Sequence, residues 1–434
     1  MRVTFFTLGC KVNQNETGAL QQLFYENGYD VQHDENNADV YVVNSCTVTS
    51  VGDKKSLQWL RRAKKENPDA ITVLTGCYPQ AFPEKATYDN ADIITGNTNR
   101  TSIIRHIDTF LQNKKKIVDI IPHLPTEKFE VLPMNNILNH TRAFMKIQDG
   151  CNRRCTFCII PTARGKVRSL PVDEVIKQAN DLVNKGFKEI VITGINLSHY
   201  GIDINYDFAS ILELLDNIDG IKRIRLGSIE PDLLPDETLL RLSKLKKLCP
   251  QFHLSLQSGC DATLKRMHRM YNSTEYFTII SKIRKLFKNA TFTTDVIVGF
   301  PGETEDEFNV SVEFIKKCKF LKVHVFSYSV RQKTPAANFS NQIPNEIKSF
   351  RNKCLSKEVN AVRNDMLDSL IGTTETVLLE KPIFTAKDGE VSYTGYTTTY
   401  IPVIVKSKIH KQGDIVRVKL GKFINDKCET TLFM

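Results

Sequence analysis

Three cysteines stand close together in the middle of the chain, at Cys151, Cys155 and Cys158. Their C-x3-C-x2-C spacing puts three thiolates on one short loop, directly after a predicted strand over 144–148. Three thiolates can hold three corners of a cubane iron–sulfur cluster, which otherwise takes four cysteines. Structural zinc is the alternative, but it needs a fourth ligand, and no further Cys or His follows at zinc-finger spacing. The loop therefore predicts a [4Fe–4S] cluster with one iron open to a small molecule.

Three other cysteines lie far apart in the sequence, yet each follows a predicted strand. Cys10, Cys46 and Cys77 follow the strands predicted over 3–8, 39–43 and 71–75. The carboxyl ends of parallel strands share one edge of a sheet, where ligands bind, so we expect these thiols to converge. Cysteines that only pack in a core are common. Three at equivalent strand ends are better explained by a second three-thiolate cluster site.

The elements that must position these cysteines predict an α/β protein. Strands and helices alternate over 1–112, which predicts a doubly wound parallel sheet. Segment 113–140 lacks periodicity and is interpreted as a linker. Strand then helix repeats six times in the segment 141–370, which predicts an open (βα)6 partial barrel and a trailing helix. Five short strands over 371–434 predict a small all-β barrel.

The composition limits the class of protein. The chain has 434 residues, of which 41% are hydrophobic and 25% are charged, the usual balance for globular proteins. We find no apolar run near the roughly 18 residues that span a bilayer, and no signal-peptide pattern. Eleven cysteines in such a chain do not suggest a disulfide framework. We expect a cytoplasmic protein without a membrane partner. The net charge of +10 is concentrated in 141–370, which favours polyanions but also fits a solvated surface.

The C-x3-C-x2-C loop at the end of a barrel strand resembles the radical S-adenosylmethionine (SAM) superfamily over about 141–330. This resemblance implies that the open iron binds the amino and carboxylate groups of SAM. Many members carry a Gly-Gly-Glu-Pro stretch after the second barrel strand, where this chain has Thr193-Gly194-Ile195-Asn196. The candidate SAM contacts on the loop and at strand ends are Phe157, Gly194, Glu230, Ser255, Gln257 and Asp295. The basic residues around the loop, expected to contact phosphate or the SAM carboxylate, are Arg153, Arg154, Arg164, Lys166 and Arg168.

Two cysteine trios followed by a β-barrel resemble the radical SAM methylthiotransferase family over essentially the whole chain. The stretches that carry the resemblance are Thr7–Gln14 (TLGCKVNQ), Asn44–Thr49 (NSCTVT), Gly76–Gln80 (GCYPQ) and Cys155–Gly165 (CTFCIIPTARG). They are similar to the bacterial branch that acts on threonylcarbamoyladenosine in tRNA. The terminal segment, with Gly395-Tyr396-Thr397 and Tyr400-Ile401-Pro402-Val403, resembles an RNA-binding TRAM domain.

The resemblance implies a transferase that converts N6-threonylcarbamoyladenosine at position 37 of tRNA, beside the anticodon, to its 2-methylthio derivative. It implies two [4Fe–4S] clusters, with the six cysteines as ligands, and SAM as the source of both a radical and a methyl group. The cluster on Cys151, Cys155 and Cys158 would cleave SAM, and the cluster on Cys10, Cys46 and Cys77 would hold the inserted sulfur. The implied partners are a tRNA anticodon stem-loop and an electron donor such as flavodoxin or ferredoxin.

Two alternatives stay open at this point. The first is a radical SAM methylthiotransferase with another substrate, either isopentenyladenosine in tRNA or a ribosomal protein. The second is an iron–sulfur RNA-binding protein without catalysis, which predicts at most one cluster and no SAM cleavage.

Overall fold

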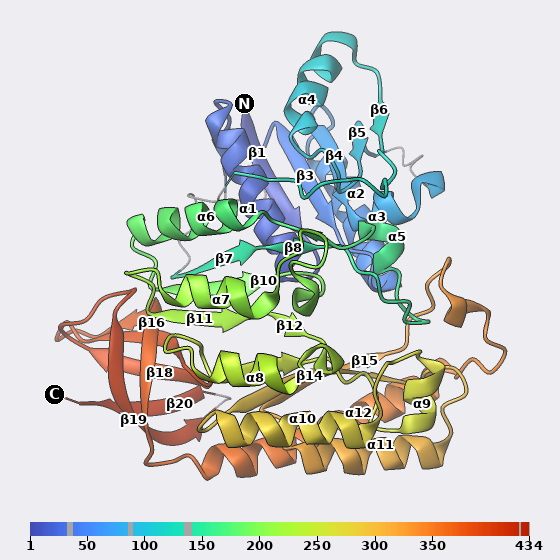
Figure 1. The fold of residues 1–434 in the computed structure, drawn as a ribbon. Helices are drawn as coiled ribbons and strands as arrows, with labels where there is room; N and C mark the ends of the chain where they lie inside the picture. The colour runs from blue at the N-terminus through green and yellow to red at the C-terminus, as the bar shows by residue number, and fades with distance from the viewer. Residues whose placement is uncertain (33–37, 86–89, 134–140, 425–426, 434) are drawn as a thin grey trace.

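The computed structural model describes residues 1–32, 38–85, 90–133, 141–424 and 427–433. Over these residues the chain forms three parts in sequence order (Figure 1). An α/β part in blue and cyan stands above an open half-barrel in green to orange, and a small red β-barrel lies against one end of the half-barrel. None of the helices in the described ranges is long and apolar enough to cross a membrane.

The first part is a parallel sheet of six strands in the order β2-β1-β3-β4-β5-β6. Its strands are β1 (Arg2–Thr7), β2 (Asp30–Val31), β3 (Val40–Ser45), β4 (Ile71–Gly76), β5 (Ile93–Thr95) and β6 (Ile117–Asp119). Its helices are α1 (Lys11–Glu26), α2 (Ser50–Glu66), α3 (Cys77–Ala81) and α4 (Ser102–Asn113), with a 3-10 turn η1 (Pro83–Lys85). α1 and α4 pack on one face through Leu20 and Ile103, and α2 packs on the other through Leu60. The predicted doubly wound sheet is confirmed.

Segment 113–140, predicted as a linker, contributes strand β6 to this sheet. A strand of three residues is too short to show the alternation by which strands are recognised in a sequence. The last part of the segment, 134–140, lies outside the described residues.

The second part is a row of parallel strands that does not close into a ring. Its strands are β7 (Arg142–Lys146), β10 (Glu189–Thr193), β11 (Arg223–Leu226), β12 (Ser228–Ile229), β13 (Gln251–Leu254), β14 (Thr291–Val298) and β15 (Lys322–Ser327). Since only Gly227 separates β11 from β12, the two act as one interrupted strand, and the predicted (βα)6 half-barrel is confirmed. A two-stranded pair, β8 (Gln148–Asp149) and β9 (Arg168–Ser169), flanks the cysteine loop.

Helices wrap the outer face of this half-barrel (Figure 1). They are α6 (Val172–Asn184), α7 (Phe208–Asp216), α8 (Asp236–Ser243), α9 (Asp261–Arg266), α10 (Ser273–Leu286), α11 (Glu305–Cys318) and α12 (Asn345–Asp368). The short helix α5 (Ile160–Arg164) follows the cysteine loop and packs against α3 of the first part. The 3-10 turns are η2 (Leu197–His199), η3 (Pro231–Leu233) and η4 (Pro335–Asn338). α11 begins with a capping box in which Thr304 and Glu307 bond each other's backbone amides.

The third part is a closed barrel of five strands in the order β16-β17-β18-β20-β19, as predicted. The strands are β16 (Thr374–Thr385), β17 (Val391–Thr397), β18 (Pro402–Ser407), β19 (Ile415–Ile424) and β20 (Lys427–Leu432). Two buried arginines of β11 hold it to the half-barrel. Arg225 donates to the carbonyls of Thr397 and Thr398 at 3.1 and 3.0 Å, and Arg223 donates to the carbonyl of Tyr396 at 3.1 Å.

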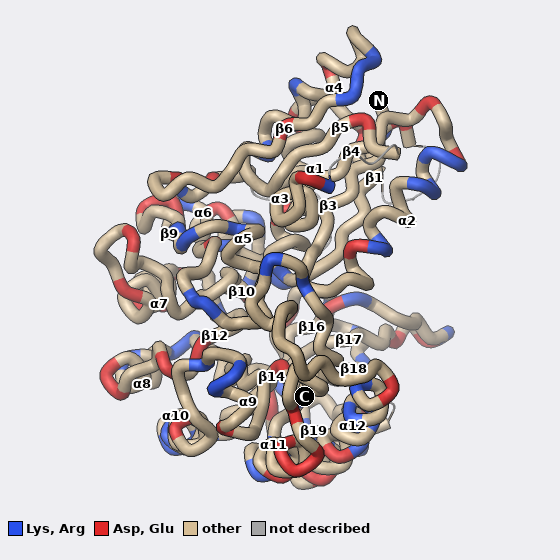
Figure 2. The backbone as a smooth tube through the Cα atoms, turned by 90° about the vertical axis from the view of Figure 1, so that its right-hand side faces the viewer, with Lys and Arg blue, Asp and Glu red and all other residues tan. Residues whose placement is uncertain are grey.

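Charges of both signs alternate along the outer helices. Figure 2 shows blue and red positions side by side on α10 and α11. Among them, Lys316 pairs with Glu313 at 3.0 Å, and Arg266 of α9 pairs with Glu307 of α11 at 2.5 Å. On these helices the positive charges of the half-barrel therefore alternate with negative charges. The distribution of charge on them does not locate an RNA-binding site.

Candidate metal centres

Cys10, Cys46 and Cys77 lie at the carboxyl ends of β1, β3 and β4, three adjacent strands of the first sheet. The Gly9 turn has a φ of +123°, and a Cβ there would stand 2.9 Å from the Cβ of Cys46. Gly76 precedes Cys77 with a φ of +99°, a conformation that side-chain-bearing residues rarely adopt. The three cysteines therefore share one edge of the sheet, and Cys77 and Cys10 lie close enough to Cys46 to raise the pKa of its thiol.

Polar groups fix the orientation of these thiols. The Cys10 thiol donates to Asn13 Oδ1 at 3.3 Å, and Asn13 Nδ2 donates to the Ser45 carbonyl at 3.0 Å. The Val48 amide donates to Cys46 Sγ at 3.4 Å. These donors and the buried Asn13 hold the sulfurs in place before any metal binds.

Burial raises the pKa of two of these thiols, Cys46 and Cys77. It raises the pKa of Cys46 to about 12, and the neighbouring Cys77 thiolate adds to the effect. Burial also raises the pKa of Cys77, although the Arg164 guanidinium opposes the change. Because the thiolate is the metal ligand, loading this site must release protons.

The second trio lies on the loop between β8 and α5. Gly150, with a φ of +70°, turns the chain into the loop, and a Cβ there would overlap the Lys166 carbonyl at 1.8 Å. Burial raises the pKa of Cys158 to about 12, with further contributions from Cys155 and Cys151. The Cys158 amide donates to the Cys155 carbonyl at 3.0 Å. The loop thus holds the three thiols close enough for their charges to interact, directly after β8.

Arg269 is the cation of this second site, and the sequence analysis did not single it out. Its Nη1 donates to Cys155 Sγ at 3.1 Å, and its Nη2 donates to the Glu230 carboxylate. The guanidinium also lies over the Tyr271 ring, 5.0 Å from its centroid. Burial raises the pKa of Glu230, while Arg269 opposes that change.

Three cysteine thiols in each set match the ligand type that a cubane iron–sulfur cluster takes. Within the described ranges, no three His, Cys, Asp or Glu side chains converge tightly enough to hold one metal ion. In a cubane each thiolate binds its own iron, so the sulfurs stand farther apart than around one zinc. Each trio also receives an N–H···S bond from a buried arginine, from Arg164 to Cys77 at 3.2 Å and from Arg269 to Cys155 at 3.1 Å. Such bonds stabilise cluster thiolates.

A buried ionic network joins the two sites. Arg164, at the end of α5, forms a bidentate pair with Glu16 of α1 at 2.8 and 2.9 Å. Lys146 of β7 lies 2.7 Å from Glu16, and Asp149 lies 3.1 Å from Arg164. Burial alone would raise the pKa of Glu16, but Arg100, Arg164 and Lys146 lower it well below its ordinary range. The carboxylate is therefore charged and holds α1 against the half-barrel.

This network corrects part of the sequence analysis. Arg164 and Arg168, expected to contact phosphate or the SAM carboxylate, are buried and bonded within the protein. Arg153 pairs with Asp232. Only Arg154 and Lys166 of the predicted basic set are exposed. A basic residue beside a cysteine loop looks the same in the sequence whether it faces solvent or a buried carboxylate.

The candidate SAM contacts fall into two groups. Glu230 and Ser255 meet at Arg269, beside Cys155, because Arg269 bonds the carboxylate of the first and the carbonyl of the second. Gly194 lies where β10 ends, and a Cβ there would stand 2.8 Å from Gln148 Oε1.

Among the described residues, the other candidates form no hydrogen bond or ion pair with a cysteine sulfur, although Phe157 directly precedes Cys158. Phe157 packs edge-on against Phe300 at 6.5 Å, in an apolar group. Gln257 adopts a φ of +71° and its amide donates to the Asp295 carbonyl at 2.9 Å. The Asp295 carboxylate lies 3.5 Å from His253 Nε2. The described contacts thus connect Gln257 and Asp295 to each other and to neighbouring strands.

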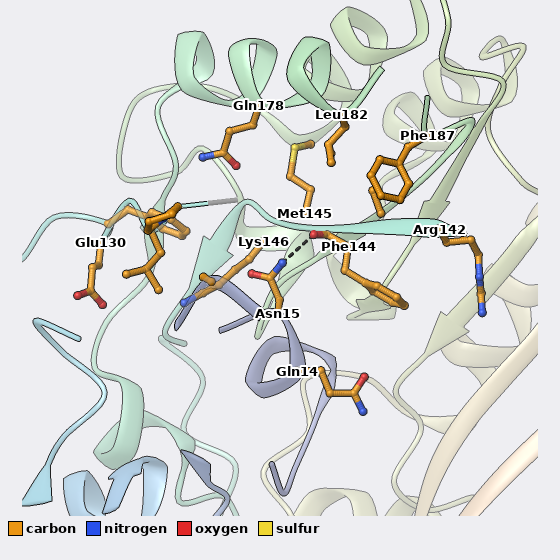
Figure 3. Close-up of a pocket in the computed structure, with 15 residues that line it drawn as sticks. Gln14, Asn15, Glu130, Arg142, Phe144, Met145, Lys146, Gln178, Leu182 and Phe187 are labelled. Atoms are coloured by element: carbon orange, nitrogen blue, oxygen red, sulfur yellow. Dashed lines mark hydrogen bonds between the residues drawn. The ribbon is translucent and has the colours of Figure 1, made fainter. Parts of the chain in front are cut away.

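A pocket of about 90 Å³ lies at the seam between α1 and β7 (Figure 3). Asn15 crosses the seam and donates to the Phe144 carbonyl at 2.7 Å. Gln178 and Leu182 of α6 close the opposite wall. None of the described lining residues is a cysteine, so this pocket is separate from both thiol sites.

Two family models match the chain. One, described as the radical SAM superfamily, matches residues 145–315, and the other, described as uncharacterized protein family UPF0004, matches residues 2–96. The first range contains the C-x3-C-x2-C loop and the half-barrel. The second contains the three strand-end cysteines.

Relatives match almost the whole chain. Threonylcarbamoyladenosine tRNA methylthiotransferase MtaB of Bacillus subtilis is 42% identical over 97% of this chain and 94% of its own. MtaB of Aquifex aeolicus is 41% identical over 82% of this chain and 87% of its own. The tRNA-2-methylthio-N(6)-dimethylallyladenosine synthase of Clostridium botulinum is 34% identical over 96% of this chain and 93% of its own.

A solved structure shares the fold. The radical SAM methyltransferase TsrM of Kitasatospora setae, with cobalamin and a [4Fe–4S] cluster bound, aligns with a TM-score of 0.57. The alignment covers 77% of this chain and 74% of the other at 11% identity, so the likeness concerns the fold alone.

Proposed function

Because the chain belongs to the radical SAM methylthiotransferase family, we propose that it transfers a methylthio group to carbon 2 of N6-threonylcarbamoyladenosine in tRNA. The observation that carries the substrate assignment is the 42% identity to the Bacillus subtilis relative over nearly the full length of both chains. The relative named for dimethylallyladenosine is 34% identical over a similar length. The relatives named here are enzymes that act on tRNA, which sets aside the non-catalytic alternative.

The family implies SAM and a [4Fe–4S] cluster, and Cys151, Cys155 and Cys158 are the residues that would hold this cluster. A reduced cluster and SAM together supply a radical that can remove hydrogen from a carbon too weakly acidic for a side-chain base. Arg269 would donate to the Cys155 sulfur and to the Glu230 carboxylate, and would thereby fix the positions of both groups.

We propose that Cys10, Cys46 and Cys77 hold a second cluster, which keeps the sulfur to be inserted. The convergence of the three thiols at one sheet edge supports this assignment, as does the Arg164 donor to Cys77. Arg164 and Glu16 would then fix the distance between the two sites, because both are buried in the interface that separates them.

The anticodon loop is the proposed partner, because its unpaired bases can be splayed out and stacked on aromatic side chains. We propose that residues 1–112 hold the second cluster, that 141–370 carry out the radical chemistry and that 371–434 bind RNA. An electron donor such as flavodoxin or ferredoxin would reduce the first cluster. An enzyme with these partners would work in the cytoplasm.

The test is a nucleoside analysis by mass spectrometry of tRNA from a host that lacks its own enzyme of this kind. Expression of the chain should convert threonylcarbamoyladenosine to its 2-methylthio form. The Cys155→Ala variant, expressed to the same level, should leave it unconverted. Methylthiolation of dimethylallyladenosine alone would contradict the proposed substrate.

A further inference from the structure

Three parts of the protein meet at a pair of stacked tyrosines. The rings of Tyr396 and Tyr400, in and after β17, stack at 4.5 Å with an interplanar angle of 14°. Arg142 of β7 lies 4.8 Å from the first ring, and Arg225 of β11 lies 4.9 Å from the second. Lys11, the first residue of α1, approaches from the N-terminal part, with Nζ 5.9 Å from the Tyr400 centroid.

Two of these three cations are already neutralised. Arg142 pairs with Glu380 at 2.6 Å, and Arg225 pairs with the buried Glu189 at 2.8 Å. Lys11 is accessible to solvent, although the protein around it lowers the pKa of its ammonium group, and it has no ion pair among the residues that the structure describes. The junction therefore presents one free ammonium group, and that residue directly follows Cys10.

Charged groups of the half-barrel act on Lys11, whose ammonium group lies over the Tyr400 ring. Of the acidic groups, Asp295 of β14 acts on its charge, yet it stands beyond ion-pair distance and instead lies 3.5 Å from His253. The charge of Lys11 also acts on His324 of β15, whose ring centroid is 6.2 Å from that of His253. Because Lys11 directly follows Cys10, a base bound beside the N-terminal cysteine trio would lie next to the residue that carries this ammonium group.

The modified adenosines named for the two kinds of relative differ by one charge. A threonylcarbamoyl group on adenine carries a carboxylate, whereas a dimethylallyl group is a neutral hydrocarbon. A pocket that selects the first needs a cation near the substituent, and a hydrogen-bonded ion pair discriminates more strongly than an apolar wall.

We propose that Lys11 binds the carboxylate of the threonylcarbamoyl group and thereby selects the substrate. This inference rests on the proposed function. The neutralised Arg142 and Arg225 fix the β-barrel in place, and Lys11 remains the group available to the ligand.

The experiment measures binding of fluorescent anticodon stem-loops to the cluster-loaded enzyme under anaerobic conditions. One RNA carries threonylcarbamoyladenosine and the other carries plain adenosine at the same position. Wild type should bind the modified loop about tenfold more tightly. Lys11→Gln should lose most of that preference and keep its affinity for the plain loop within about twofold, whereas Lys11→Arg should retain the preference. Lys288→Gln, on a distant exposed lysine, is the matched control.

The outcomes separate the two claims. A Lys11→Gln enzyme that keeps the preference overturns the role of Lys11, and so does equal weakening toward both loops, which indicates a phosphate contact. Iron content equal to wild type shows that the neighbouring Cys10 still binds metal. Failure of the wild type to methylthiolate the modified loop would overturn the proposed function instead.

Discussion

Arg164 Nε donates a hydrogen bond to Cys77 Sγ over 3.2 Å, across the boundary between the N-terminal sheet and the half-barrel. Arg164 ends α5, the helix that begins two residues after Cys158. One buried side chain therefore connects the cysteine loop of one site with a sulfur of the other. Its remaining donors bond Glu16, Asn13 and Asp149, which leaves it no freedom to turn toward a ligand.

Arg164→Gln should destabilise the protein strongly. The substitution leaves the buried Glu16 and Asp149 carboxylates short of a counter-charge, and breaking a buried ion pair from one side typically costs about 3–5 kcal/mol. Urea denaturation of iron-free wild type and variant measures the loss. Arg154→Gln, on an exposed arginine of the cysteine loop that precedes α5, should change the free energy of unfolding by no more than about 0.5 kcal/mol. Equal stability of the two variants would contradict the role of Arg164.

Arg269→Gln should make the cluster on Cys151, Cys155 and Cys158 harder to reduce. The change removes a positive charge and an N–H···S donor from Cys155, and both stabilise the reduced, more negative state. A redox titration followed by electron paramagnetic resonance should show a midpoint potential lower by several tens of millivolts. Lys265→Gln, an exposed lysine in α9, should leave the potential unchanged. An unchanged potential in Arg269→Gln would show that this hydrogen bond does not tune the cluster.

Cluster loading should improve as pH rises from 7 to 9. The pKa values of Cys46 and Cys158 are raised to about 12, so both thiols hold a proton throughout this range and must lose it when iron binds. Each released proton makes apparent affinity about tenfold weaker per unit decrease in pH. Iron retained against a chelator measures the effect. Cys46→Ala should show a shallower pH dependence, because fewer protons are released. Loading independent of pH would contradict the prediction.

The positions of the cysteines were predictable because local rules determine them. A short loop fixes the spacing of Cys151, Cys155 and Cys158. The rule that parallel strands end at one edge brings Cys10 and Cys77 together although they lie in different βα units. The structure confirms the sheet, half-barrel and barrel that follow from the same patterns.

The polar partners of those cysteines could not be predicted, because they come from distant segments. Glu16 and Arg164 are separated by 148 residues, and Arg269 lies 114 residues from Cys155. The expectation that Arg164 contacts phosphate was wrong, since one sequence position does not reveal a buried carboxylate across an interface. One indication of this buried network was present in the sequence, namely Glu16. It lies four residues after Val12 and four before Leu20, which places a carboxylate on the apolar face of α1.

The most direct test of the two-site account is iron and sulfide counting on anaerobically reconstituted protein, with SAM cleavage measured in parallel. Wild type should hold about eight iron atoms per chain, and Cys46→Ala and Cys155→Ala should each hold about four. Cys46→Ala should still form deoxyadenosine without product, whereas Cys155→Ala should form neither. A wild type with about four irons, or a Cys46→Ala variant that still inserts sulfur, would contradict the second cluster site.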